Sequence, residues 1–130
     1  MEKITYAVTV KVVGGPTIPL AGALDVDAYE KLDVTVPARA GGADGTADVA
    51  VAPGNLDAVR VLIITSSIED GKLSFKTSAN GAADVPVTGP ITLIGGGAVS
   101  LLGAKPDHLT FTNAAPTAAQ VAILVGRKAT

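Results

Sequence analysis

His108 is the only histidine in the chain, and imidazole is the side chain best suited to general-base chemistry near neutral pH. It follows Asp107, just before a segment with strand character. Nucleophilic catalysis also requires a nucleophile held beside the base. The chain has no cysteine, and none of its serines lies in an elbow motif such as Gly-x-Ser-x-Gly. Asp107-His108 is therefore expected to be loop surface, and the protein is not expected to be an enzyme.

Acidic residues offer a second kind of chemistry, the binding of a hard cation. Asp25 and Asp27 lie close together, with Glu30 nearby, but a calcium loop needs further oxygen ligands at fixed spacing. These residues are predicted to be solvated loop charges. Glu69-Asp70, which precedes Gly71, is predicted to form a turn. We expect no metal site and no cofactor.

Gly95-Gly96-Gly97 follows an apolar segment, which is a place where glycines can cradle a phosphate. Phosphate loops lead into a helix N-terminus and usually include a lysine. The segment that follows, 98–102, has strand character and no lysine. The glycines are therefore predicted to form a turn or bulge.

Composition excludes further classes of function. Hydrophobic residues make up 48% of the 130 residues and charged residues only 17%, which implies either little exposed surface or surface that is buried in an assembly. The net charge is −2 and the basic residues are scattered, so no nucleic-acid partner is expected. No segment approaches the roughly 20 apolar residues of a membrane helix, and residues 1–5 do not resemble a signal peptide. We expect neither a membrane partner nor secretion. The positive residues to consider as partner contacts, or simply as solubilising charges, are Lys11, Arg39, Arg60, Arg127 and Lys128.

The elements that would position these residues are strands. Residues 3–13 and 30–36 alternate between apolar and polar side chains, as half-buried antiparallel strands do. A strand at 85–88 should lie at a sheet edge because it contains Pro86, and 25–27 is expected to be a loop or an irregular edge. No stretch has a helical period. Further short strands are expected at 17–20, 47–51, 59–65, 72–77, 91–94, 98–102, 109–112 and 120–126. Short strands with turn signals at close spacing favour a sandwich or a barrel. The sequence predicts an all-β protein, a single-domain antiparallel β-sandwich spanning residues 1–130, with about eight short strands.

Two strands are apolar on both faces. In Val59–Thr65, the core face is expected to carry Val59, Val61 and Ile63, which leaves Leu62 and Ile64 on a second face that needs another cover. The last strand is similar, with Val121, Ile123 and Val125 on one face and Ala122 and Leu124 on the other. Apolar, charge-poor faces are typical of subunit interfaces. The predicted oligomer interface therefore consists of Leu62, Ile64, Ala122 and Leu124, with the loops at 38–45 and 78–84 as the alternative.

The closing segment carries a resemblance. Leu109-Thr110-Phe111-Thr112-Asn113, a loop of small residues and the strand 120–126 resemble the closing hairpin of small β-sandwich virion proteins. In its size, its bias toward Ala, Gly, Val, Asp and Thr, and its lack of Cys and Trp, the whole chain is similar to decoration (cement) proteins of tailed-bacteriophage capsids.

This resemblance implies a jelly-roll-like module that binds the outside of an icosahedral shell, usually as a homotrimer, and straps neighbouring subunits together. Its partners would be copies of itself and the major capsid protein. It would be located at the virion surface after synthesis in the host cytoplasm. The family offers no site residues to transfer. Because the first strand begins near residue 3, we expect no long arm at the N-terminus, so that loops and short ends would contact the shell.

Two other classes of function remain. A ligand- or glycan-binding β-sandwich module would need exposed aromatic rings, and the chain contains only Tyr6, Tyr29, Phe75 and Phe111. A small β-barrel enzyme would need a polar pocket.

Overall fold

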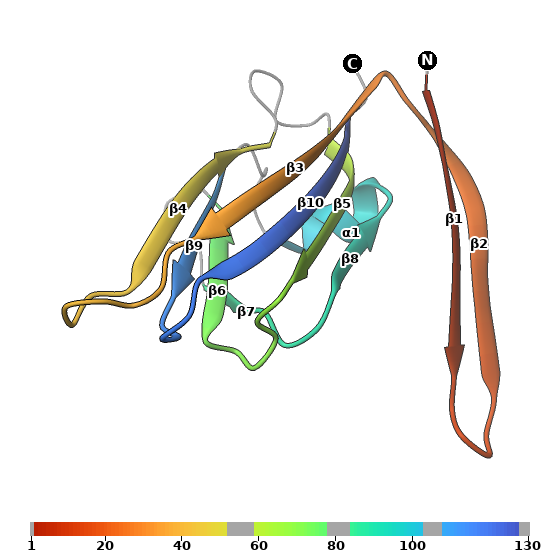
Figure 1. Cartoon of the computed structure of the whole chain (residues 1–130). Coiled ribbons are helices and arrows are strands. Elements are labelled where there is room, and N and C mark those ends of the chain that lie inside the picture. Colours follow the sequence, from red (N-terminus) through yellow and green to blue (C-terminus); the bar gives the residue numbers. More distant parts are fainter. Residues whose placement is uncertain (1, 52–58, 78–83, 103–107, 128–130) are drawn as a thin grey trace.

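The computed structural model describes residues 2–51, 59–77, 84–102 and 108–127 (Figure 1). The regular structure of this part is β-strand apart from two short helices, as expected for a chain rich in β-branched residues. The helices are α1 (Gly96–Val99) and the 3₁₀ helix η2 (Ser100–Leu102). The strands are β1 (Glu2–Lys11), β2 (Thr17–Val26), β3 (Ala28–Val36), β4 (Gly45–Ala50), β5 (Val59–Ser66), β6 (Leu73–Thr77), β7 (Val85–Pro86), β8 (Ile91–Ile94), β9 (His108–Asn113) and β10 (Ala119–Arg127).

Strands β3 to β10 form two antiparallel sheets, with the orders β3-β10-β5-β8 and β4-β9-β6-β7. Four pairings are nested one inside the next: β3 with β10, β4 with β9, β5 with β8, and β6 with β7. This is the pattern of one long two-stranded ribbon that has been rolled up, and rolling adds the pairings of β10 with β5 and of β9 with β6. The order is that of an eight-stranded jelly roll. The predicted all-β, jelly-roll-like sandwich is confirmed, and the described residues contain ten strands rather than about eight because β1 and β2 precede the roll.

The core lies between the two sheets and is almost entirely aliphatic. Its aromatic members are Phe75 on β6 and Phe111 on β9, which are neighbours in register and whose ring centroids lie 5.8 Å apart. The two strands expected to be most buried, β5 and β10, occupy the centre of one sheet. Pro86 lies on β7, an edge strand, as predicted, because proline cannot donate a ladder hydrogen bond.

Val59 belongs to the core as predicted, but after the register irregularity beside it the faces of β5 are the reverse of those predicted from the sequence. Leu62 and Ile64 are 0% exposed and belong to the core between the sheets, opposite Val125 and Ile123 in register. Val61 and Ile63 lie on the outer face instead. Both faces of this strand are apolar, so alternation alone could not distinguish the inner face from the outer one.

The first 26 residues form a two-stranded hairpin that we call the arm (β1 and β2, residues 2–26). Its strands pair with each other over their whole length, from Glu2 with Val26 to Lys11 with Thr17, and with no other strand. Figure 1 shows that the arm diverges from the sandwich toward its tip. The first strand does begin where the sequence predicts, but the expectation that there is no long N-terminal arm is wrong. The expected short strand at 17–20 continues to Val26, so residues 25 and 26 are strand rather than loop.

The strand expected at 98–102 is helical. Gly95 has a φ of +99°, which lets the chain turn directly from β8 into α1 and η2. Val99 is buried and Leu102 packs against the core, whereas Leu101 is exposed. The apolar contacts are therefore three residues apart, which is a helical spacing that the short apolar run concealed.

Candidate interaction surfaces

One face of the arm is apolar along its whole length. The register pairs Ile4 with Leu24, Val8 with Leu20 and Val10 with Ile18, so these side chains share a face. The opposite face is small or polar, with residues such as Thr5, Ala7 and Thr9. Toward the tip the apolar face is open to solvent: Val10, Ile18 and Leu20 are 50%, 53% and 51% exposed, and Val13 in the turn is 97% exposed.

The base of the arm is anchored on the sandwich at Gly126 of β10. A Cβ atom at Gly126 would lie 2.8 Å from the Cδ1 of Ile4 and 3.3 Å from the Cγ1 of Val26, so the missing side chain makes room for the arm. Val26 is fully buried there. The backbone N–H of Asp27 donates to the carbonyl of Arg127 over 2.8 Å, which ties the end of the arm to the end of β10.

Arg127 also holds the base together through its side chain. Its Nη1 donates to the carbonyl of Val51 over 2.9 Å, and its Nη2 pairs with Glu30 over 3.2 Å. Of the basic residues singled out in the sequence, Arg127 is thus engaged within the chain. Lys11 lies at the end of β1, beside the turn of the arm. Lys128 lies outside the described residues.

A groove of about 560 Å³ separates the arm from the sandwich. Tyr6, Val8 and Leu20 line its arm side, together with Pro19 and Ala21. Thr92, Ile94 and Ala98 line its other side, which belongs to β8 and α1. The groove therefore has one wall made by the apolar face of the arm and one made by the edge of the sandwich.

The outer face of the β3-β10-β5-β8 sheet is a second open apolar surface. Ala122, Leu124 and Ile63 lie there and are partly exposed. A hollow of about 360 Å³ borders Ala122 and is otherwise lined mainly by polar residues, among them Asp33, Thr65 and Gln120. Of the predicted interface residues, Ala122 and Leu124 are thus accessible to a partner, whereas Leu62 and Ile64 are covered by the opposite sheet of the same chain.

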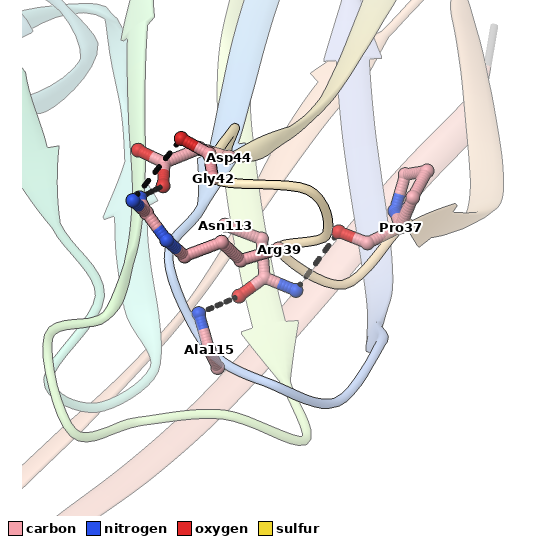
Figure 2. Close-up of polar contacts among 6 residues, drawn as sticks. All are labelled: Pro37, Arg39, Gly42, Asp44, Asn113 and Ala115. Carbon is pink, nitrogen blue, oxygen red and sulfur yellow. Dashed lines mark hydrogen bonds and ion pairs between the residues drawn. The ribbon is translucent and has the colours of Figure 1, made fainter.

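The loop at 38–45, the alternative interface, is closed on itself (Figure 2). The guanidinium of Arg39 pairs with Asp44 and donates to the carbonyl of Gly42 over 3.2 Å. The backbone N–H of Arg39 donates to the carbonyl of Ala115, which ties this loop to the β9–β10 turn. Arg39 therefore has a structural partner, and its loop is held in place. Positions 78–83 of the other alternative loop lie outside the described residues.

His108 lies on β9 rather than in a loop, and its Nδ1 is 3.5 Å from a carboxylate oxygen of Asp48 on β4. Thr110 donates to the other carboxylate oxygen of Asp48 over 3.2 Å. The threonine hydroxyl thus donates to the carboxylate of Asp48, whereas a nucleophile that is activated by a histidine donates to the imidazole. Asp107 lies outside the described residues.

The acidic residues considered as cation ligands do not gather. Asp25 lies opposite Lys3 in the arm, and Glu30 pairs with Arg127. Within the described ranges, no group of three or more His, Cys, Asp and Glu is arranged to hold a metal ion. Asp70 accepts a hydrogen bond from the backbone N–H of Lys72, as the predicted turn at Glu69-Asp70 requires.

Of the three glycines predicted to form a turn or bulge, Gly95 forms the turn from β8, whereas Gly96 and Gly97 are the first residues of α1. The side chain of Arg60 lies against Gly96, with its Cδ 3.4 Å from where a Cβ would be. The helix that follows is a single turn long. No helix among the described residues is long and apolar enough to cross a membrane. Comparison of the chain with protein-family models, with curated proteins and with solved structures gives no match.

The exposed apolar residues of the arm were missed in the sequence because each strand was considered alone. The signal that could have found them is the symmetry about Gly14-Gly15-Pro16. On each side of this turn lies a strand of ten residues. The apolar side chains of the two strands occupy positions that fall on the same face of the hairpin once the strands pair.

Proposed function

We propose that this protein is a non-enzymatic structural protein of a tailed-bacteriophage virion, which binds the outside of the icosahedral capsid as an oligomer and stabilises the shell. The observation that carries the proposal is the exposed apolar surface of a small jelly roll, on the outer half of the arm and around Leu124. Contiguous exposed apolar surface of this kind marks protein–protein contact sites. The resemblance in size and composition to decoration proteins directs the proposal to a capsid.

The arm and the outer sheet face suit a protein that bridges neighbours. Both lie on one side of the jelly roll, since the arm is anchored on β10, the strand that carries Leu124. The apolar face of the arm is poor in charge, as interface cores are, whereas Ala122 and Leu124 on the outer sheet face are flanked in register by Asp33 and Lys31 of β3. A cement function requires contact area and no reactive group. The major capsid protein is therefore the proposed partner, together with further copies of this chain.

The test uses capsids of the phage whose genome encodes the chain, prepared without it. We expect the purified protein to sediment with these capsids, to saturate at a fixed number of copies per capsomer and to raise the temperature at which the shells break open. A control with unexpanded procapsids shows whether binding depends on shell maturation. Absence of co-sedimentation at high micromolar concentration would remove this function. A major capsid gene beside the gene for this chain would support it independently.

A glycan-binding module is the second candidate, and the observation that favours it is the exposed ring of Tyr29, at 56% exposure. Phe75 and Phe111 are fully buried and unable to stack on a sugar. A glycan array probed with the protein and with its Tyr29→Ala variant distinguishes the two functions. Binding that disappears in the variant would favour the module, and an array without signal would eliminate it.

A further inference from the structure

The arm has an apolar face that this chain does not cover. An isolated two-stranded hairpin is marginally stable in water, and this one is anchored only at its base. With Val10, Val12, Ile18 and Leu20 each about half exposed and Val13 almost fully so, the arm presents roughly 500 Å² of apolar surface. That is as large as the largest patch on a typical monomeric protein, and it lies on the least supported element of the fold.

We propose that a second copy of this chain covers the arm, with the two arms clasped so that each lies in the groove between the arm and the sandwich of the other. The inference does not rest on the proposed capsid function. It accounts for two features together: an apolar arm face without a cover, and a groove of about 560 Å³ of which that face is one wall.

The shape of the groove selects a two-fold arrangement. The apolar face of each arm forms one wall of the groove in its own copy. When the arm of a second copy enters this groove and turns its apolar face toward that wall, the apolar faces of the two arms meet. The same contact then exists in both grooves at once, as an isologous interface requires. The opposite face of the entering arm, with Ala7, Ala21 and Thr9, meets Ile94 and Ala98 of the other copy. Small side chains on that face permit the close approach.

The charges on the arm determine whether the two arms pack parallel or antiparallel to each other. Lys11 is the only charged residue between positions 9 and 19, so the tip is basic. Asp25 and Asp27 outnumber Lys3 at the base, so the base is acidic. Two arms packed antiparallel, tip toward base, bring Lys11 of each copy toward the acidic base of the other. A parallel arrangement would place like charges side by side.

The available area is sufficient for a stable pair. Specific interfaces bury about 600–1,000 Å² per partner. The clasp covers the roughly 500 Å² of exposed apolar surface on each arm and adds the lining of the groove at Thr92, Ile94 and Ala98. Val12 and Val13, at the tip, then lie against the base of the other arm. The two-fold axis passes near Val8, midway along the arm between its tip and its base.

Disulfide trapping tests this geometry, because the chain has no cysteine and any disulfide must join two copies. We expect the Val8→Cys variant of the full chain to form covalent dimers under mild oxidation, because Val8 lies near the two-fold axis. Thr46→Cys is the matched control, since Thr46 is exposed on β4, in the opposite sheet. If Val8→Cys gives no more dimer than Thr46→Cys, the clasp is wrong.

Sedimentation velocity tests the assembly without a cross-link. We expect the unmodified protein to be a dimer, and Leu20→Lys to shift it to monomer with an unchanged β-sheet signal in circular dichroism. Thr46→Lys makes the same change of charge away from the arm and should remain a dimer. A monomeric wild-type protein at high micromolar concentration would overturn the proposal. So would a particle of three copies, the number that the resemblance to decoration proteins implies, or a Leu20→Lys variant that stays folded and dimeric.

Discussion

At the scale of single residues, the most constrained polar group in the described part of the chain is the side chain of Asn113. It is 0% exposed at the end of β9, and its amide nitrogen donates to the carbonyls of Pro37 and Thr117 over 3.2 and 2.9 Å. Its oxygen accepts from the backbone N–H of Ala115 over 2.9 Å (Figure 2). One side chain thus joins the ends of three strands, β3, β9 and β10. The sequence did not reveal this role, because an Asn followed by small residues has the pattern of an ordinary loop.

Replacing Asn113 by Asp should make the stability depend on pH. The carboxylate would be buried and would face the carbonyls of Pro37 and Thr117, so the folded state raises the pKa of the new acid. A raised pKa means that the variant is most stable below the unfolded value of about 4 and loses stability as the pH rises through the folded value. We expect the difference in urea midpoint between variant and wild type to grow from about pH 4 to pH 7.

The control for this prediction is Asn113→Ala, which removes the same hydrogen bonds without adding a titrating group. It should lose about 1–3 kcal/mol of unfolding free energy at both pH values, because buried partners are left unsatisfied. An Asn113→Asp variant that is equally stable at both pH values would show that the site is solvated.

At the scale of elements, the alternating strands were predictable and the assignment of their faces was not. Residues 3–11 and 30–36 alternate between apolar and polar side chains, which fixes both strand character and the apolar face. Alternation does not say what covers an apolar face. The apolar face of β3 packs on the core, whereas the apolar face of β1 is exposed in the half that lies toward the tip of the arm. Where both faces are apolar, as in β5, only the tertiary pairing decides which one is inside.

The docking of the arm on β10 can be tested at Gly126. A valine there would bring side-chain atoms into the space that Ile4 and Val26 occupy. Overpacking of this kind costs about 1–3 kcal/mol, and 1.4 kcal/mol corresponds to about a factor of ten in an equilibrium. We therefore expect amide hydrogen exchange to quicken about tenfold in β1 and β2 of Gly126→Val, with little change in β6 and β9 of the opposite sheet. The strand β5 is not a reference here, because Val61 also lies 3.3 Å from the added Cβ.

Ala122→Val is the matched control, because Ala122 lies on the same face of the same strand, farther from the arm. Its effect on exchange in β1 and β2 should be small. Equal acceleration in both variants, or in the sandwich as much as in the arm, would show that the arm does not open as a separate unit.

At the scale of the whole molecule, the β-sandwich could be predicted from the sequence because the turn signals and short strands favour a sandwich or a barrel. The nested pairing that makes it a jelly roll joins strands far apart in the chain, β3 to β10 and β4 to β9. No local pattern encodes such pairings. The four predicted interface residues fall into two groups for this reason. Ala122 and Leu124 lie on the outer face of the roll, whereas Leu62 and Ile64 lie inside it.

The last prediction follows from that division. Leu62→Asp places an unpaired charge in the core between the sheets and removes burial worth about 1.5–3 kcal/mol. We expect this variant not to fold, as a lost β signal in circular dichroism would show. Leu124→Asp places the same charge on the partly exposed outer face, where water still reaches it. That variant should remain folded. It should bind capsids more weakly, and it should form fewer oligomers larger than the dimer that the arms are proposed to make.

Thr46→Asp adds the same charge to the opposite sheet and controls for net charge. Light scattering and co-sedimentation with capsids measure the three variants side by side. If Leu124→Asp behaves like Thr46→Asp in both measurements, the outer face of β10 is ordinary solvent-facing surface. Contact with partners must then be sought in the arm and in the loops at 38–45 and 78–84, because Ala122 and Leu124 are the predicted interface residues that remain accessible.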